Sequence, residues 1–152
     1  MPDFEELKSN NDLKAILKSA FDADLDIGGS WGYTQALSTI VYSTERPLKQ
    51  FEHMFASMRA YVEMNMTKEK KERYGSINLN ELSRERILID EQNYHKVIYE
   101  ITAIKEDVYN SFIEEYKEYY GQESFDLNLH FEKRREATLH REVEHWFKIL
   151  SV

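Results

Sequence analysis

The sequence predicts an α+β fold, in which helices pack on an antiparallel sheet of about four to five strands. The length of 152 residues is usual for one domain, so we expect a single domain over residues 1–152. A hydrophobic fraction of 41% and an aromatic fraction of 13% are too high for a disordered chain. Segments with helical spacing and segments with strand alternation occur without a regular β-α-β order, which is typical of this fold class.

The first third of the chain predicts a helix followed by a hairpin. Asp3 and Glu6 have the spacing of a capping box, and apolar residues recur at helical intervals, so roughly the first two dozen residues form one helix or two short ones. Residues 22–27 alternate aspartate with apolar side chains, and the pair Gly28–Gly29 predicts a turn. Residues 30–43, with β-branched side chains toward their end, complete the predicted hairpin.

The middle of the chain predicts one long helix and a second hairpin. Pro47 suits the first position of a helix, and apolar residues follow it at helical spacing to about Met66. The polar stretch 67–76 predicts a loop. Residues 86–90 and 94–104 flank a short polar turn, and the second segment is dense in Val, Ile and Tyr, so we expect an antiparallel pair.

The last third predicts a helix, a strand and one ambiguous segment. Apolar residues keep helical spacing over 106–120, and Gly121 is a natural residue to follow a helix end. Residues 125–131 alternate apolar and polar side chains, which predicts a strand with one buried face. Residues 137–150 fit both periods, and their Glu, Lys and Arg content favours a helix.

Charge and composition disfavour several classes of protein. Lys and Arg number 20 against 28 Asp and Glu, and the net charge of −8 disfavours nucleic acid as a partner. The chain has no cysteine, which removes disulfides, thiolate metal sites and cysteine nucleophiles and suits a reducing cytoplasm. No export signal and no apolar run of about 18 residues is present, so we expect no membrane partner. Nucleotide-binding glycine motifs are missing, and no cofactor is predicted.

The stretch GGSWG, residues 28–32, matches the G-x-S-x-G pattern of a hydrolase nucleophile elbow. With the residues after it, the stretch resembles the elbow of proline iminopeptidases of the α/β-hydrolase family. The residues that carry this likeness are Gly28, Ser30, Gly32, Thr34, Ala36 and Leu37. The resemblance implies a small serine hydrolase with Ser30 as its nucleophile and an Asp and a His downstream.

The strand before this motif does not suit an elbow. An elbow strand is central in its sheet and almost continuously apolar, whereas residues 22–27 carry three aspartates. We therefore favour a structural role for the glycines, as a turn and a bulge beside Trp31, and assign no catalytic residue.

A single E-x-x-H spacing, Glu142 and His145, would lie on one face if residues 137–150 are helical. Di-iron bundles use this motif in pairs, and the chain carries one copy. A solvated charged face is therefore favoured over a metal site. Metal binding through this pair is an alternative hypothesis, and no metal ligand is assigned.

Aromatic side chains supply the candidate binding residues. Tyr116, Tyr119 and Tyr120 crowd one side of a predicted helix. Trp31 and Tyr33 project to the same side if their segment is a strand, either as a lid on the core, which we favour, or as an aromatic floor for a ligand or partner. Because Tyr and Trp are enriched at interfaces, these residues and the acidic charge favour a non-enzymatic protein-interaction module. Such a module would be an inhibitor or immunity-type protein with a basic partner, or a homo-oligomer.

Overall fold

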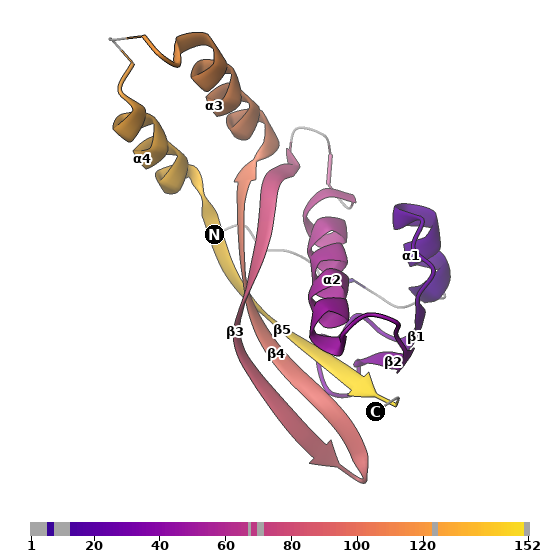
Figure 1. The fold of residues 1–152 in the computed structure, drawn as a ribbon. Coiled ribbons are helices and arrows are strands. Elements are labelled where there is room, and N and C mark those ends of the chain that lie inside the picture. The colour runs from indigo at the N-terminus through magenta and orange to yellow at the C-terminus, as the bar shows by residue number, and fades with distance from the viewer. Residues whose placement is uncertain (1–5, 8–12, 67, 70–71, 123–124, 151–152) are drawn as a thin grey trace.

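Five strands form one sheet, and four α-helices pack around it (Figure 1). This arrangement comes from a computed structural model, which describes residues 6–7, 13–66, 68–69, 72–122 and 125–150. The helices are α1 (Leu13–Phe21), α2 (Leu48–Tyr61), its π-helical continuation η1 (Val62–Met66), α3 (Glu106–Tyr119) and α4 (Leu127–Ala137). The strands are β1 (Asp26–Gly29), β2 (Thr39–Ser43), β3 (Tyr74–Ile89), β4 (Gln92–Lys105) and β5 (Leu139–Ile149).

The strand order in the sheet is β1-β2-β5-β4-β3. Three of the pairings are antiparallel, and β2 pairs with β5 in parallel. The last strand of the chain therefore lies in the centre of the sheet, with a hydrogen-bonded neighbour on each side. The α+β prediction is confirmed, and the sheet has five strands.

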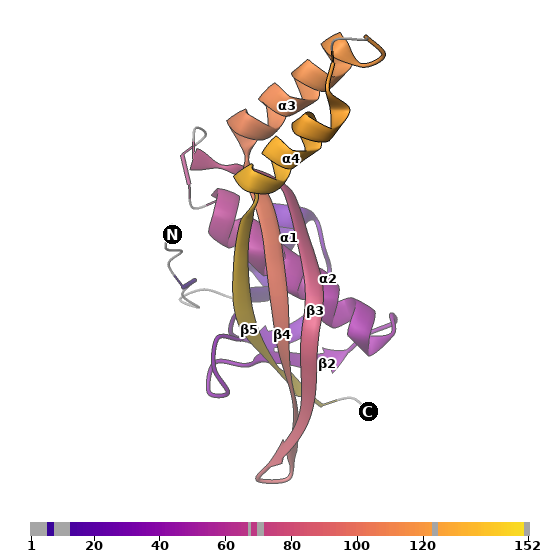
Figure 2. The ribbon, with the colours of Figure 1, turned by 90° about the vertical axis from the view of Figure 1, so that its left-hand side faces the viewer.

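The core lies between α2 and one face of the sheet. Alternate residues of β4, among them Val97, Tyr99 and Ile101, are buried on this side, and α2 contributes Phe51 and Phe55. Each large apolar side chain buried in this way stabilises the fold by roughly 1.5–3 kcal/mol. Among the described residues, no helix covers the other face of β3, β4 and β5, which is turned to the viewer in Figure 2.

Several predicted elements are present. A helix ends at Phe21, the segment after Pro47 is helical through Met66, and α3 covers most of the predicted 106–120 helix. Residues 86–90 and 94–104 lie on the predicted antiparallel pair, with Ile87 opposite Tyr94. The capping box at Asp3 and the residues just before Leu13 lie outside the described part of the chain.

Two predictions for the last third are wrong. Residues 125–131 are mostly helical, because Asp126 caps α4 by accepting a hydrogen bond from the backbone N–H of Leu129 at 3.0 Å. Residues 139–149 form a strand, because their strand parity buries His145, Phe147 and Ile149 while pairing the backbone on both edges. Glu, Lys and Arg content misled the sequence interpretation, since many of these side chains lie on the uncovered face.

The turn of the first hairpin is also longer than predicted. Gly28 and Gly29 belong to β1, and residues 30–38 connect it to β2. The polar stretch 67–76 is a loop only in part, since β3 begins at Tyr74. In the part of the chain that the structure describes, no helix is both long and apolar enough to cross a membrane.

Candidate functional site

A cluster of charged side chains is buried where α2 crosses β3 and β4. Glu52 of α2 is completely buried, and its two oxygens have different partners. One oxygen accepts a hydrogen bond from Arg84 at 2.7 Å, and the other lies 2.8 Å from Nδ1 of His95. Arg84 also bonds Glu81 at 2.7 Å, so two carboxylates hold its guanidinium. The cluster joins the helix to both long strands.

The partners of His95 determine which nitrogen carries its proton. A carboxylate is an acceptor, so the 2.8 Å contact requires Nδ1 of His95 to donate to Glu52. The other nitrogen, Nε2, is then the one that can exchange a proton with a ligand.

Arg84 keeps a carboxylate partner on each side, and its hydrogen bonds to Glu81 and Glu52 raise its pKa although burial opposes its charge. The same bond from Arg84 lowers the pKa of Glu81.

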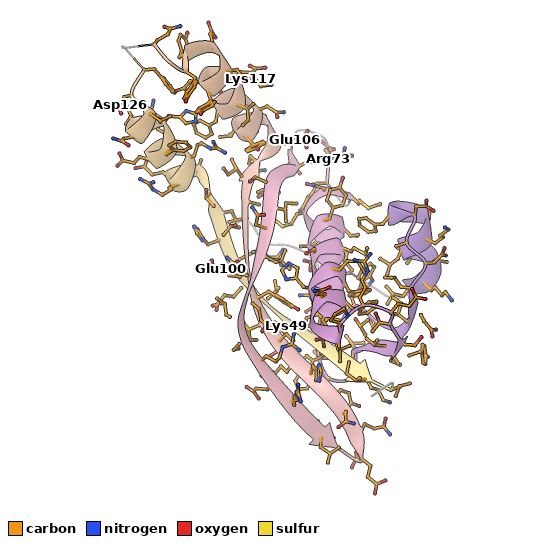
Figure 3. The ribbon with its side chains drawn as sticks, viewed as in Figure 1. Lys49, Arg73, Glu100, Glu106, Lys117 and Asp126 are labelled. Carbon is orange, nitrogen blue, oxygen red and sulfur yellow. The ribbon has the colours of Figure 1, made fainter. Side chains whose placement is uncertain are left out.

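A cavity of about 450 Å³ lies directly beside this histidine. Its wall combines charged, polar and apolar side chains. The lining residues are Thr44, Arg46, Leu48, Arg86, Asn93, Tyr94, His95 and Ile149. They come from the β2–α2 loop with the first residue of α2, from the turn end of β3–β4 and from the end of β5, so three parts of the chain that are far apart in sequence converge here. Lys49, the second residue of α2, is labelled in Figure 3 and shows where the start of this helix lies beside the long strands.

The two arginines of the cavity are its main electrostatic feature. Among the described residues, neither Arg46 nor Arg86 has a carboxylate within ion-pair distance, whereas Arg59, Arg84 and Arg141 are each paired. Arg46 and Arg86 together place two guanidinium groups at the wall of one cavity. The start of α2 adds the positive end of a helix dipole at Leu48. The cavity is therefore suited to an anion.

A second buried network lies farther along α2. Arg59 is 2% exposed and donates to the backbone oxygens of Trp31 and Glu144. Burial lowers its pKa, which the nearby charge of Glu63 partly offsets. Glu63 in turn accepts hydrogen bonds from Tyr33 and Arg141. This network ties the first hairpin, α2 and β5 together, which is a structural role.

The predicted binding residues fall in two separate places. Trp31 is 2% exposed and packs against Phe55, so it belongs to the core, and Tyr33 is half-buried with its ring under the Arg59 guanidinium. Burial, followed by the charge of Glu63, raises the pKa of Tyr33. The other three tyrosines lie at the far end of the α3–α4 pair. Tyr116 stacks on Tyr120 at 4.8 Å, and Tyr119 and Tyr120 are 42% and 62% exposed.

Ser30 does not lie at a strand-to-helix turn. It follows β1, its segment leads into β2, and its backbone oxygen accepts a hydrogen bond from Thr39. The local structure that a nucleophile elbow requires is therefore not present at Ser30.

Glu142 and His145 lie on opposite faces of β5, because residues three apart on a strand point to opposite sides. The shared helix face on which the metal hypothesis depended does not exist. Within the described segments, no group of three or more His, Asp or Glu side chains is arranged to hold a metal ion.

Sequence reasoning missed the Glu52–His95 pair altogether. The partners are 43 positions apart, and no motif spacing connects them. No sequence signal marks these residues for burial: Glu52, Arg59 and Glu63 form one stripe along α2 and η1, and charged residues on a helix are usually solvated.

Comparison of the chain with protein-family models, with curated proteins and with solved structures found no significant match.

Proposed function

We propose that the cavity beside His95 binds a small organic anion and that His95 exchanges a proton with it. The observation that carries this proposal is the 2.8 Å contact between buried Glu52 and His95 at the wall of a cavity lined by two unpaired arginines. Guanidinium groups bind carboxylates and phosphates through paired, charge-assisted hydrogen bonds. A volume of about 450 Å³ suits a small metabolite.

Each residue of the site has a distinct role in this proposal. Arg46 and Arg86 bind the anionic group, and the apolar wall formed by Leu48 and Ile149 receives the rest of the molecule. Glu52 orients the imidazole of His95, as the carboxylate does in carboxylate–histidine pairs of hydrolases. Nε2 of His95 takes or gives the proton, a contribution typically worth about 10²–10⁴-fold in rate.

NMR spectroscopy of the histidine side chains tests this proposal directly. A long-range ¹H–¹⁵N spectrum should show that neutral His95 carries its proton on Nδ1. Titration with inorganic phosphate and with a panel of small mono- and dicarboxylates should shift the Nε2 resonance of His95 for at least one compound. If His95 responds to none of these compounds, or carries its neutral proton on Nε2, the proposal is overturned.

Arginine variants test how the anion is bound. Arg46→Gln and Arg86→Gln should each weaken binding by at least about tenfold, because each removes a charge-assisted hydrogen bond. Arg73→Gln is the matched control: it removes the same charge at an exposed site before β3, far from the β3–β4 turn (Figure 3). Equal losses in all three variants would indicate a general charge effect and contradict a specific site.

A protein-interaction module is a second candidate function, supported by the exposure of Tyr119 and Tyr120 and by the net charge of −8. The absence of cysteine is compatible with a reducing compartment, and we place this activity in the cytoplasm. The test is titration against a panel of basic proteins at low and high ionic strength. Association that is weakened both by salt and by Tyr119→Ser/Tyr120→Ser supports this function, and the absence of any association contradicts it.

A further inference from the structure

A second cavity, of about 360 Å³, lies where the C-terminal part of α4 meets the start of β3 and the end of β4. Glu100 and Glu106, labelled in Figure 3, lie on either side of this stretch of β4. The cavity beside His95 lies near the turn that joins β3 to β4, at the other end of these two strands. The two cavities share no lining residue, so they are separate sites.

One side of α4 supplies the charged wall of this second cavity. Phe131, Arg134 and Arg135 line it, and their spacing of three and four residues places them on the same side of the helix. Glu132 and Glu136 lie elsewhere on α4 and do not line the cavity. Among the described residues that form the wall, none is Asp or Glu, so the wall carries two positive charges and no negative one.

Two aromatic rings hold the guanidinium group of Arg134 in place. Its Cζ atom lies 5.7 Å from the ring centroid of Tyr109 and 5.7 Å from that of Phe131. A guanidinium group that lies over a ring keeps the N–H donors in its own plane available to an anion. In the part of the chain that the structure describes, the guanidinium groups of Arg134 and Arg135 have no hydrogen-bonding or ion-pair partner. Both groups are therefore able to bind a ligand.

A strained residue of β3 forms another part of the wall. Ser76 has a φ of +52°, in the left-handed region that favours glycine, and lies in a β-bulge between Gly75 and Asn78. Strained backbone of this kind is concentrated at binding and catalytic sites. Within the described segments, the hydroxyl of Ser76 and that of Thr102 on β4 have no hydrogen-bonding partner. Two strands therefore add hydroxyl donors to a cavity that α4 lines with guanidinium groups.

We propose that this cavity binds a small phosphomonoester, with the phosphate held by Arg134, Arg135 and the hydroxyls of Ser76 and Thr102. The donors come from one helix and two strands, and the tetrahedral oxygens of a phosphate accept hydrogen bonds from several directions, whereas the two oxygens of a carboxylate lie in one plane. Phe131 is 39% exposed and contacts the organic group of the ester. A volume of about 360 Å³ suits a small molecule. The proposal is independent of the site beside His95 and of the protein-interaction function.

NMR titration tests the proposal, because backbone amide resonances report each cavity separately. Phenyl phosphate and inorganic phosphate, added at constant ionic strength, should shift the amide resonances of Ser76 and Thr102. Phenyl phosphate should bind more tightly than inorganic phosphate, since its ring contacts Phe131, and more tightly than benzoate, which lacks the tetrahedral group. Phe131→Leu should reduce the preference for phenyl phosphate over inorganic phosphate and leave the binding of inorganic phosphate unchanged.

Substitution of the arginines tests how the phosphate is held. Arg134→Gln and Arg135→Gln should each raise the dissociation constant for phenyl phosphate at least about tenfold, because each removes a charge-assisted hydrogen bond. Lys133→Gln is the matched control, since it removes the same charge from a neighbouring residue of α4 that does not line the cavity. Circular dichroism confirms that each variant is folded.

Failure of this proposal is distinguishable from failure of the site beside His95. Arg86→Gln removes a charge from that other cavity and should leave the shifts of Ser76 and Thr102 unchanged. The proposal is overturned if these two amides do not respond to about 10 mM phenyl phosphate, or if Lys133→Gln weakens binding as much as Arg134→Gln does. Benzoate binding as tight as that of phenyl phosphate would overturn the assignment to a phosphate.

Discussion

Gly32, the last residue of the GGSWG stretch, provides a test of how the first hairpin packs on β5. Its φ of +90° lies in the left-handed region, where a residue with a side chain costs about 1–2 kcal/mol. A Cβ atom at this position would overlap Cδ2 and Nε2 of His145 and would lie 2.9 Å from the backbone oxygen of Trp146. Overpacking of this kind costs a further 1–3 kcal/mol or so. We therefore expect Gly32→Ala to destabilise the protein by about 2–5 kcal/mol.

Neither side of this contact has room to move. The backbone N–H of Gly32 donates to Leu37, and its oxygen accepts from Trp146, both at 2.7 Å. His145 is fully buried, stacks on Phe147 at 4.1 Å and lies 3.0 Å from the hydroxyl of Thr39. Relaxation at one partner would therefore break hydrogen bonds or stacking at the other.

Gly121→Ala is the matched control for this prediction. Gly121 has a similar φ of +88°, and a Cβ atom there would meet nothing within 4 Å. Its substitution should cost only the backbone term of about 1–2 kcal/mol. Urea denaturation, followed by tryptophan fluorescence, gives the free energy of unfolding for both variants. If Gly32→Ala loses no more than Gly121→Ala within about 0.5 kcal/mol, the close packing of Gly32 on His145 is refuted.

Two further predictions concern the same region. Trp31→Ala should lower the free energy of unfolding by about 3–5 kcal/mol, because Trp31 is 2% exposed against Phe55; a loss below about 1 kcal/mol, measured by circular dichroism in urea, would exclude its core role. Burial, and secondarily the charge of Arg59, hold the pKa of His145 well below its usual value, so the folded protein keeps His145 neutral. The unfolded chain takes up a proton below about pH 6.5, so stability should fall with decreasing pH by about 1.4 kcal/mol per pH unit. His145→Gln should remove this slope, whereas the exposed-site control His140→Gln should keep it; equal slopes in both variants would contradict a neutral His145.

The sequence alone was sufficient for segments whose apolar residues fit only one spacing, either that of a helix or that of a strand. The α2 segment alternates buried and exposed positions at helical spacing for four turns, and no strand pairing competes with it. At the turn end of the β3–β4 hairpin, residues 86–90 and 94–104 combine β-branched residues with a polar turn, so the pairing of this part is specified locally. The rest of β3, from Tyr74 to Glu85, was not predicted. The fold class follows from such elements, because the hydrophobic period decides which faces must be buried.

Only the tertiary structure decided the elements whose sequences fit both periods. Residues 139–149 become a strand because β2 and β4 offer hydrogen-bonding partners on both edges, a gain that helical propensity does not match. Residues 127–137 become a helix because the Asp126 cap and the burial of His130 against aromatic rings outweigh the local alternation. Propensity differences of a few tenths of a kcal/mol per residue are small beside such long-range terms.

The candidate site was decided by tertiary packing to an even greater degree. Glu52 and His95 meet because α2 crosses β4, and the two arginines reach their cavity from a loop and a strand 40 positions apart. A charged residue on a helix is usually solvated, so its sequence context gives no reason to expect burial. Burial of Glu52 is stable only because Arg84 and His95 each form a hydrogen bond with one of its oxygens. These partners lie on other elements and reach Glu52 only in the folded chain.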